Sequence, residues 1–373
     1  MDVAADPALA GLVDRVRAAQ AARTPLCITG GGSKAFYGGL PRGEPLSTAG
    51  LSGISSYEPS ELVVTARAGT PLVQLEAALA EAGQWLAFEP PRFRAMAGDA
   101  AGIAGGTVGG MVAAGLAGPG RMAAGGVRDH VLGLTMLNGR AEVLSFGGQV
   151  MKNVAGYDVS RLMAGSLGVL GVILEVSLKV LPRPLTTLSL RFECSQAQAT
   201  DQLKAWATEP LPITATAWWS GVLVLRLAGA AAAVQAAHQR LGGEVVEPAL
   251  AEAFWGGLRD HTDEFFQGAQ RAVASGATLW RLAVPPTTPP LALPGEQLVE
   301  WHGGQRWVVT TAPAATLRDA AAAVGGHAVA FRRGQGVTAF AALSAPLARI
   351  QRQIKQAFDP DGLFNPGRLH VEW

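Results

Sequence analysis

The chain has 373 residues and a net charge of +1, from 30 basic and 29 acidic side chains, and this length predicts two domains. The absence of a basic excess or stripe argues against a nucleic-acid-binding surface. The two cysteines, Cys27 and Cys194, are too few and too far apart for a disulfide framework or a Cys-based metal site, and they fit a reducing cytoplasm.

Neither of two alanine-rich segments near the N-terminus is expected to enter a membrane. The first 19 residues carry early acids and form an amphipathic pattern, without the basic start and apolar core of a signal peptide. The uncharged run Ala100–Gly120 is long enough to span a bilayer. Its many glycines each cost about 1 kcal/mol in a helix relative to alanine, so it predicts a buried turn and helix instead.

The first block, to residue 183, alternates strands with loops and short helices. Strands are expected at Leu26–Thr29 and Leu62–Ala66, and a helix at 71–82, capped by Thr70 with Pro71 in its first position. Further on, two strand-like runs flank Asn138-Gly139. This dipeptide favours a type I′ hairpin because both turn positions need positive φ.

A strand at Val172–Leu181, stopped by Pro182-Arg183-Pro184, ends the first block and leads into a second one over 184–345. A repeated strand–helix–strand pattern there indicates a small α+β domain. Strands are expected at 185–192, 222–227, 277–284, 305–310 and 328–333, and helices at 196–208, 230–241 and 313–324. A third block, 346–373, contains a helix at 347–358, with Leu347, Ile350, Ile354 and Phe358 on one face, and a tight tail.

Glycine gathers in three clusters of the first block, each beside an expected strand. The clusters are Gly30-Gly31-Gly32-Ser33-Lys34, Gly105-Gly106-Thr107-Val108-Gly109-Gly110 and Gly165-Ser166-Leu167-Gly168-Val169-Leu170-Gly171. A diphosphate needs several backbone N–H donors at close range, which a Cβ would obstruct. Any one cluster is equally well explained by a tight turn, but three in one domain favour a dinucleotide.

A nicotinamide Rossmann site is the first alternative. Residues 30–35 formally fit the GxGxxA pattern after a strand, but that pattern must open a helix. Tyr37-Gly38-Gly39-Leu40-Pro41 follows instead and would break one. The chain contains no GxxxxGK[ST] sequence, which excludes a P-loop. The phosphates are therefore expected to be held by loops.

The order of these clusters resembles the FAD-binding domain of the vanillyl-alcohol-oxidase or PCMH type. The matching segments are ITGGGSKAFYG (28–38), GTVGGMVAAGLAGPGRMAAGGVRDHVLGL (106–134), KNVAGYDVSRLMAGSLGVLGVILEVSLKVLP (152–182) and DPDGLFNPGRL (359–369). Together they are most similar to the FAD subunits of bacterial glycolate oxidases. The resemblance implies an α+β fold with three parts: a PCMH-type FAD-binding domain (1–183), a ferredoxin-like α+β cap domain (184–345), and a C-terminal helix and tail (346–373) returning to the first domain.

The resemblance also assigns FAD as the cofactor and places its binding residues. The expected diphosphate ligands are Gly30, Gly31, Gly32, Ser33, Lys34, Gly106, Thr107, Val108, Gly109 and Gly110. Along the ribityl, flavin or adenine portions it implies Gly120, Val172 and Ile173. Covalently flavinylated relatives carry His or Cys at set positions, whereas the first loop here has Ser33 and Lys34. A noncovalent FAD is therefore expected.

Catalytic residues are not identified by the sequence. Related hydroxy-acid dehydrogenases need an arginine for the substrate carboxylate and a base for the hydroxyl proton, and some add a histidine-bound metal. The six histidines here include no closely spaced pair, so no metal site is expected. Arg332, Arg333 and Arg368 are candidates for the carboxylate, and exposed surface positions are the commoner outcome. His130 and Asp158 are expected to have structural roles.

The resemblance implies an FAD subunit of a multi-subunit glycolate dehydrogenase that acts on a small 2-hydroxy acid. Its partners would be a larger flavin subunit and an iron–sulfur subunit, because two cysteines cannot hold a cluster. The expected location is the cytoplasm, with contact to the inner membrane only through partners. Two alternatives stay open: a noncatalytic electron-relay or scaffold subunit, and a stand-alone oxidoreductase of the same fold.

Overall fold

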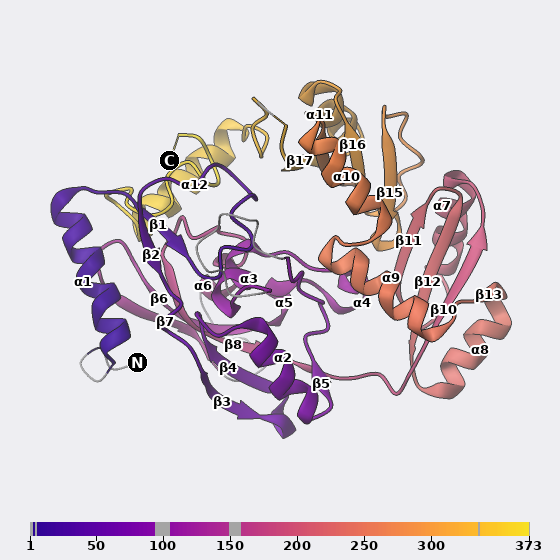
Figure 1. The fold of residues 1–373 in the computed structure, drawn as a ribbon, viewed down its shortest axis with the longest axis horizontal. Helices are drawn as coiled ribbons and strands as arrows, with labels where there is room; N and C mark the ends of the chain where they lie inside the picture. Colours follow the sequence, from indigo (N-terminus) through magenta and orange to yellow (C-terminus); the bar gives the residue numbers. More distant parts are fainter. Residues whose placement is uncertain (1–2, 4–5, 94–104, 149–157, 335, 373) are drawn as a thin grey trace.

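A computed structural model describes residues 3, 6–93, 105–148, 158–334 and 336–372 of the chain. Two bodies lie side by side, and Figure 1 shows that the chain begins and ends in the same one. The first body holds the FAD-type domain that the sequence predicted, and the second is the cap. Between them, β8 (Val172–Lys179) belongs to the first body's sheet and β10 (Thr186–Glu193) to the cap's. The chain passes from one sheet to the other between residues 179 and 186, and the boundary near residue 183 stays a prediction.

An antiparallel sheet of five strands, in the order β3-β4-β8-β6-β7, forms the centre of the first body. Its other strands are β3 (Ile54–Glu58), β4 (Val63–Arg67), β6 (Val131–Leu137) and β7 (Val143–Gly147). Apolar side chains pair across it, with Val64 opposite Leu178 and Leu134 opposite Val176. All four are buried in one core, because alternate residues of a strand face the same side.

Short helices and a small parallel sheet surround this centre. The helices are α1 (Pro7–Ala22), α2 (Leu72–Glu81), α3 (Val108–Ala114), α4 (Arg121–Ala124), α5 (Val127–His130) and α6 (Val159–Leu162). Strands β1 (Leu26–Thr29) and β2 (Glu44–Ser47) pair in parallel, and Phe364 of the tail bridges to Leu26 on the other side of β1. The tail thus lies against the N-terminal strand, as Figure 1 shows. A further pair, β5 (Gln84–Trp85) and β9 (Leu181–Pro182), lies at the side facing the cap.

The expected cap of α2 was wrong. Pro71 occupies the N-cap position, and no side chain caps the helix. The Thr70 hydroxyl instead donates to the Gly53 carbonyl at 2.9 Å and accepts from the Gly53 amide at 3.0 Å. Thr70 therefore caps the turn at Gly53 and not α2. Pro71 occupies the N-cap position, so Thr70 lies one residue too early to bond to the first turn of the helix.

The hairpin at Asn138 exists, but its turn differs from the predicted type I′. The last pair of β6 and β7 is Leu137 with Val143, and the turn residue with a positive φ, 57°, is Ala141. Gly139 has no positive φ; a Cβ there would lie 2.6 Å from Asp359 Oδ1, and its amide donates to the Phe358 carbonyl. The glycine is therefore required by the close approach of the C-terminal segment.

The cap is one antiparallel sheet of eight strands made from two ferredoxin-like units. The first unit runs β10, α7 (Gln196–Trp206), β11 (Ile213–Trp219), β12 (Val222–Gly229), α8 (Ala231–Leu241) and β13 (Glu244–Val245). The second runs β14 (Thr278–Ala283), β15 (Glu296–Glu300), β16 (Gln305–Thr310), α11 (Ala314–Ala323) and β17 (His327–Arg332). The order β13-β10-β12-β11-β15-β16-β14-β17 joins them at their second strands. The proline-rich segment 284–295, between β14 and β15, takes the place of the first crossover helix of the second unit.

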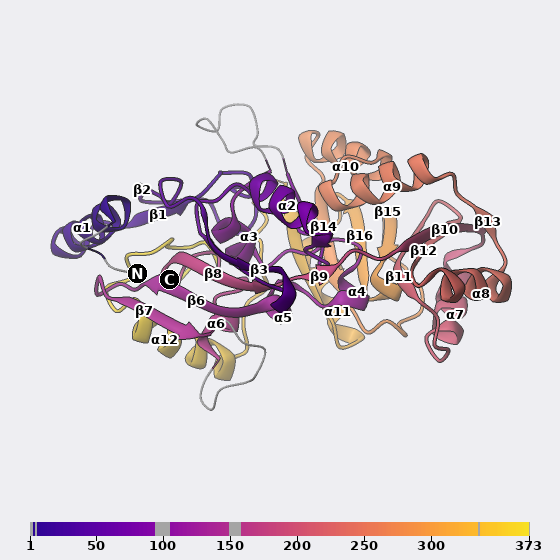
Figure 2. The ribbon, with the colours of Figure 1, turned by 90° about the horizontal axis from the view of Figure 1, so that it is seen from below.

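Two helices that the sequence pattern missed, α9 (Pro248–Asp260) and α10 (Glu264–Ala274), cover the other face of this sheet from α7, α8 and α11 (Figure 2). Strands β11 and β15 were missed as well. Trp255 of α9 and Phe331 of β17 share one core with Tyr37 and Phe93 of the first body. The two bodies are therefore joined by a common hydrophobic core.

The C-terminal helix α12 (Ala345–Phe358) has a smaller buried face than predicted. Ile354 and Phe358 pack against the core of the first body, whereas Leu347 and Ile350 are about half exposed, at 51% and 49%. In the described part of the chain, no helix is long and apolar enough to cross a membrane. The described portion of the Ala100–Gly120 run contains only the short helix α3, and residues 100–104 lie outside the described residues.

Candidate functional site

A cleft lies between the first glycine loop, α3 and the segment before β8. It consists of two adjoining cavities of about 110 and 60 Å³. Residues that line both are Ile28, Gly30, Gly110, Ala113, Leu167 and Asn365. Segments from four separate parts of the sequence therefore meet around one space.

The first glycine loop presents free amide groups beside the larger cavity. Among the described residues, none of the amides of residues 31–34 has a backbone acceptor. Gly32 has a φ of +71°, and a Cβ there would touch nothing within 4 Å, so its backbone conformation alone favours glycine. A run of unpaired N–H groups next to a cavity forms the kind of concave site that binds anions.

Glycine has a different role where the first two clusters meet. A Cβ on Gly30 would lie 2.3 Å from the Thr107 hydroxyl, and one on Gly106 would lie 2.8 Å from the Ser33 hydroxyl. The two loops thus interlock at distances that only glycine allows. This contact fixes the first loop against the start of α3.

The first turn of α3 has already used its amide donors. Val108 donates to the Thr70 carbonyl and Gly109 to the Ala68 carbonyl, while the Thr107 side chain accepts from Gly110. A Cβ on Gly109 would lie 2.7 Å from the Ala68 Cβ, away from the loop that presents free amides. A larger residue at position 109 would therefore disturb packing before it reached a ligand. The available donors come from the first loop.

Lys34 supplies a positive charge at this cleft. Its Nζ lies 3.4 Å from the Ser33 hydroxyl and has no carboxylate partner in the described part of the chain. Burial lowers its pKa to about 8, although Asp260 acts in the opposite direction. A buried ammonium without a partner is costly, so an anion bound beside it would be stabilising.

The third glycine cluster and the tail close the cleft on its other side. The Asn365 amide group donates to the Leu167 carbonyl and accepts from the Ile28 amide, each at 2.7 Å. Arg368 donates to the Ala35 and Gly39 carbonyls, at 2.8 and 2.5 Å. Both tail residues donate hydrogen bonds to loop carbonyls. The Arg368 guanidinium, a candidate for the substrate carboxylate, is thus bound to the first loop.

Most of the predicted cofactor residues meet at this cleft. Those that line it are Gly30, Gly31, Gly32, Ser33, Lys34, Gly106, Thr107, Gly109, Gly110 and Ile173. Val108 and Val172 are buried in the cores beneath it. The sequence did not predict four lining residues, Ala113, Leu167, Asn365 and Arg368. All four lie in segments that carry the resemblance. No local pattern shows, however, that the C-terminal tail contacts a loop about 200 residues earlier.

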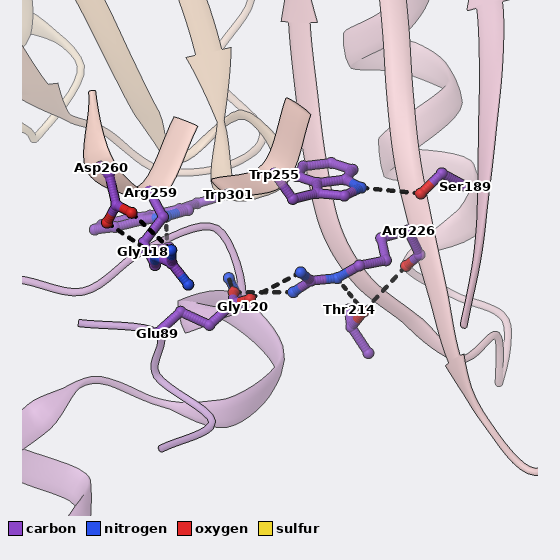
Figure 3. Close-up of polar contacts among 10 residues, drawn as sticks. All are labelled: Glu89, Gly118, Gly120, Ser189, Thr214, Arg226, Trp255, Arg259, Asp260 and Trp301. Carbon is purple, nitrogen blue, oxygen red and sulfur yellow. Dashed lines mark hydrogen bonds and ion pairs between the residues drawn. The ribbon is translucent and has the colours of Figure 1, made fainter. Parts of the chain in front are cut away.

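Gly120 lies at the contact with the cap, shown in Figure 3. Its amide donates to Glu89 Oε2 at 2.5 Å. The same carboxylate accepts two hydrogen bonds from Arg226 of β12, at 2.8 and 2.9 Å, and both side chains are buried. Arg226 is also held by Thr214 and lies over the Trp255 ring. This bidentate ion pair joins the two bodies.

A second contact holds the neighbouring residues. Trp301 of the cap donates its indole N–H to the Gly118 carbonyl at 3.0 Å, and the Arg121 guanidinium lies 4.6 Å from the Trp301 ring centroid. The 118–121 segment, which follows α3, is thus held by the cap on both sides of Gly120. Figure 3 shows the contact between Trp301 and Gly118. The position of the cap is therefore tied to the helix that lines the cleft.

Two other sequence candidates have structural contacts. The ring nitrogens of His130 lie 3.1 Å from the Lys179 carbonyl and 3.0 Å from the Ala124 carbonyl. The Asp158 side chain caps α6 by accepting from the Arg161 amide. The KNVAG residues before it, with Tyr157, lie outside the described residues.

Comparison with known proteins agrees with this geometry. Residues 9–147 match the family described as "FAD binding domain". The chain is 47% identical to the glycolate oxidase subunit GlcE of Escherichia coli over 361 residues, which cover 97% of each protein. It is also 30% identical to a D-lactate dehydrogenase of Archaeoglobus fulgidus, over 45% of this chain and 36% of that protein.

A solved structure shows the same fold over nearly the whole chain. An alkyldihydroxyacetonephosphate synthase superposes with a TM-score of 0.65, covering 95% of this chain and 75% of that one, at 13% sequence identity. At this low sequence identity, the superposition shows a shared fold and nothing about a shared function.

The free amides of the first loop, the unpaired Lys34 and the glycine-lined cleft fit the diphosphate of a dinucleotide. The match over residues 9–147 identifies that dinucleotide as FAD. The similarity to GlcE extends from end to end and therefore includes the cap as well as the cleft. The chain thus belongs to the family of the glycolate oxidase subunit GlcE, and it is an FAD-binding flavoprotein of the oxidoreductase class with a PCMH-type domain.

Proposed function

We propose that the chain is the FAD subunit of a multi-subunit glycolate dehydrogenase, which oxidises a small 2-hydroxy acid to the 2-oxo acid. The observation that carries this proposal is the 47% identity, over 97% of both chains, to a protein named as a subunit of glycolate oxidase. Electrons would leave to an iron–sulfur subunit. With two cysteines in the whole chain, the four thiolates of a typical cluster must come from another protein.

The residues of the cleft would hold FAD without a covalent bond. The amides of residues 31–34 and the Lys34 ammonium would bind the diphosphate, and Ala113, Leu167 and Ile173 would border the rest of the molecule. When bound, the flavin supplies a hydride acceptor. The protein's own contribution is to bind and orient it and to fix the cap over the cleft.

Co-expression tests the assembly. The isolated chain is expected to show little glycolate-dependent reduction of an artificial acceptor, and activity should appear when a larger flavin subunit and an iron–sulfur subunit are co-expressed. Anaerobic addition of glycolate to the chain alone distinguishes the alternatives. Bleaching of its flavin favours a catalytic subunit, and an unchanged flavin in an active complex favours a relay. Rapid steady-state turnover by the chain alone would contradict the need for partners.

Release of the cofactor tests the noncovalent site. Acid or heat should liberate intact FAD from the yellow protein. Flavin that stays attached to the denatured chain would contradict a noncovalent site. A colourless protein that cannot be reconstituted with FAD would contradict the proposed function as a whole.

A further inference from the structure

We infer that Lys355, near the end of α12, is a positioning residue for FAD, because its ammonium fastens two walls of the cleft to each other. These walls are the third glycine cluster and the C-terminal tail, and residues of both line the cleft, whereas Lys355 does not. The inference rests on the assignment of this cleft to FAD. It does not depend on the substrate or the partner subunits proposed above.

The Lys355 ammonium makes three hydrogen bonds in a buried position. Its Nζ donates to the Val169 carbonyl at 2.7 Å, to the Phe364 carbonyl at 3.1 Å and to Asp359 Oδ2 at 2.5 Å. The Lys355 side chain is 8% exposed, and that of Asp359 is fully buried. Among the described residues, no backbone amide donates to either of the two carbonyls. The ammonium is therefore their hydrogen-bond donor, and all three of its N–H groups are used.

Each of these two carbonyls belongs to a residue next to the cleft. The first follows Gly168 and the second precedes Asn365, and both of these neighbours line the cleft. A Cβ on Gly168 would lie 2.6 Å from Asn365 Nδ2, and the same Asn365 amide group donates to the Leu167 carbonyl. The loop and the tail are thus joined at two points, by Asn365 in the cleft wall and by Lys355 outside it. A shift of either segment would change the shape of the cleft.

Asp359 has a role that can be separated from that of Lys355. It lies one helical turn after Lys355 and supplies the counter-charge that a buried ammonium needs. Its carboxylate also accepts from the Leu363 amide at 3.0 Å and from the Phe364 amide at 2.8 Å, which holds the tail in a turn. Asp359 has no contact with the third glycine cluster among these bonds. Only Lys355 links that cluster to the tail through the buried pair.

Two variants of the full chain separate positioning from stability. Lys355→Met leaves the Asp359 carboxylate buried without its counter-ion, so the unfolding midpoint in denaturant and the FAD affinity should both fall. Lys355→Met/Asp359→Asn removes both charges and should recover part of the midpoint. Its FAD affinity should stay about tenfold or more below that of the wild type, because the Val169 and Phe364 carbonyls still lack their donor. If the single variant does not fold, the charge-neutral double variant still provides the comparison.

Flavin fluorescence during titration of the FAD-free protein measures the affinity. Visible circular dichroism at saturating FAD reports the surroundings of the bound flavin, and it should differ from the wild type in the double variant. Leu317→Ala is the control for lost stability, because Leu317 is fully buried in the cap, in the core that contains Trp280 and Val308. It should lower the unfolding midpoint and leave the affinity and the dichroism unchanged. Ala113→Leu, which fills the cleft, is the control for lost binding.

The outcomes distinguish a failure of this inference from a failure of the cleft assignment. Wild-type FAD affinity and dichroism in the double variant, with weakened binding in Ala113→Leu, would show that Lys355 only stabilises the fold. An equal loss of affinity in Leu317→Ala would also overturn the inference, because any loss of stability would then weaken binding. Full affinity in both Ala113→Leu and the double variant would place FAD outside this cleft and overturn the two assignments together.

Discussion

The cofactor cleft and the contact between the two bodies are built from different parts of the chain. The cleft is mainly backbone: glycines that interlock, amide groups of residues 31–34, and carbonyls held by Asn365 and Arg368. The contact with the cap is mainly side chains: the Glu89–Arg226 ion pair, Trp301, and the rings around Phe331.

This difference determines how each region responds to substitution. A backbone site changes when a side chain is added, because the added atoms occupy the ligand's space. A side-chain contact changes when a group is removed, because its buried partner is left unsatisfied. The second effect is the larger one for a buried charge.

Arg226→Met is expected to have the largest effect. It leaves the Glu89 carboxylate buried with only the Gly120 amide as a partner, and breaking a buried ion pair in this way costs about 3–5 kcal/mol. Denaturant unfolding should show this loss, and the double variant Glu89→Gln/Arg226→Met should recover part of it. Arg240→Met is the control, because Arg240 is 66% exposed and its partner Glu209 is only partly buried. An equal loss of unfolding free energy in both arginine variants would show that the buried interdomain pair stabilises the protein no more than an exposed pair does.

Glu300→Gln sharpens the contrast by changing charge without shape. Burial raises the pKa of Glu300 from 4.5 to about 7, despite hydrogen bonds from Trp307 and Gln305. The folded state therefore binds more protons than the unfolded state between these values, and stability is lost as the pH rises through 7. At pH 8 the glutamine variant should be more stable than the wild type by about 1–3 kcal/mol, and the difference should fade by pH 4. The control Glu296→Gln changes an exposed carboxylate that also accepts from an indole N–H and should show no such pH dependence.

Ala113→Leu tests the cleft by filling it. Ala113 lines both cavities, so the larger side chain should occupy cofactor space and weaken FAD binding roughly 10- to 100-fold, from about 1–3 kcal/mol of overpacking. Flavin fluorescence during titration of the FAD-free protein measures this affinity. Ala231→Leu, on the exposed side of α8, is the matched control. Unchanged affinity in a folded Ala113→Leu protein would place the cofactor elsewhere.

Lys34→Met should have the smallest effect, about tenfold in FAD affinity at pH 7. Since a bound diphosphate favours the charged ammonium, wild-type affinity should fall as the pH rises through about 8, whereas the variant's should stay level. Lys204→Met, at a partly exposed lysine paired with the exposed Asp201, should match the wild type at every pH. A pH-dependent affinity that persists without Lys34 would assign the titration to another group.

Sequence patterns predicted the elements of the cap better than their arrangement. Helices 196–208, 230–241 and 313–324 correspond to α7, α8 and α11. The pairing of β11 with β15, which fuses two units into one sheet, was not predicted. Strand β11 alternates apolar and polar residues only over residues 213–217 and then ends in two tryptophans, and β15 (EQLVE) does not alternate; both lie in the middle of the sheet. Helices α9 and α10 were missed although their buried residues recur at helical spacing, with Ala251, Trp255 and Leu258 in α9 and Phe265 and Ala269 in α10.

The sequence by itself determined the cofactor class, because glycine clusters and Lys34 are local signals: positive φ, close approach and a free amide depend on neighbouring residues. Three contacts depend on the tertiary structure alone: Gly109 packs on Ala68, Asp359 packs closely against Gly139, and Arg368 donates to carbonyls of the first loop. The tertiary structure also decided that Arg281 lies over the Phe331 ring and Arg332 over the Phe36 ring. These contacts join residues 40 to 330 positions apart, and the free energy of such packing depends on the folded arrangement, which no local pattern encodes.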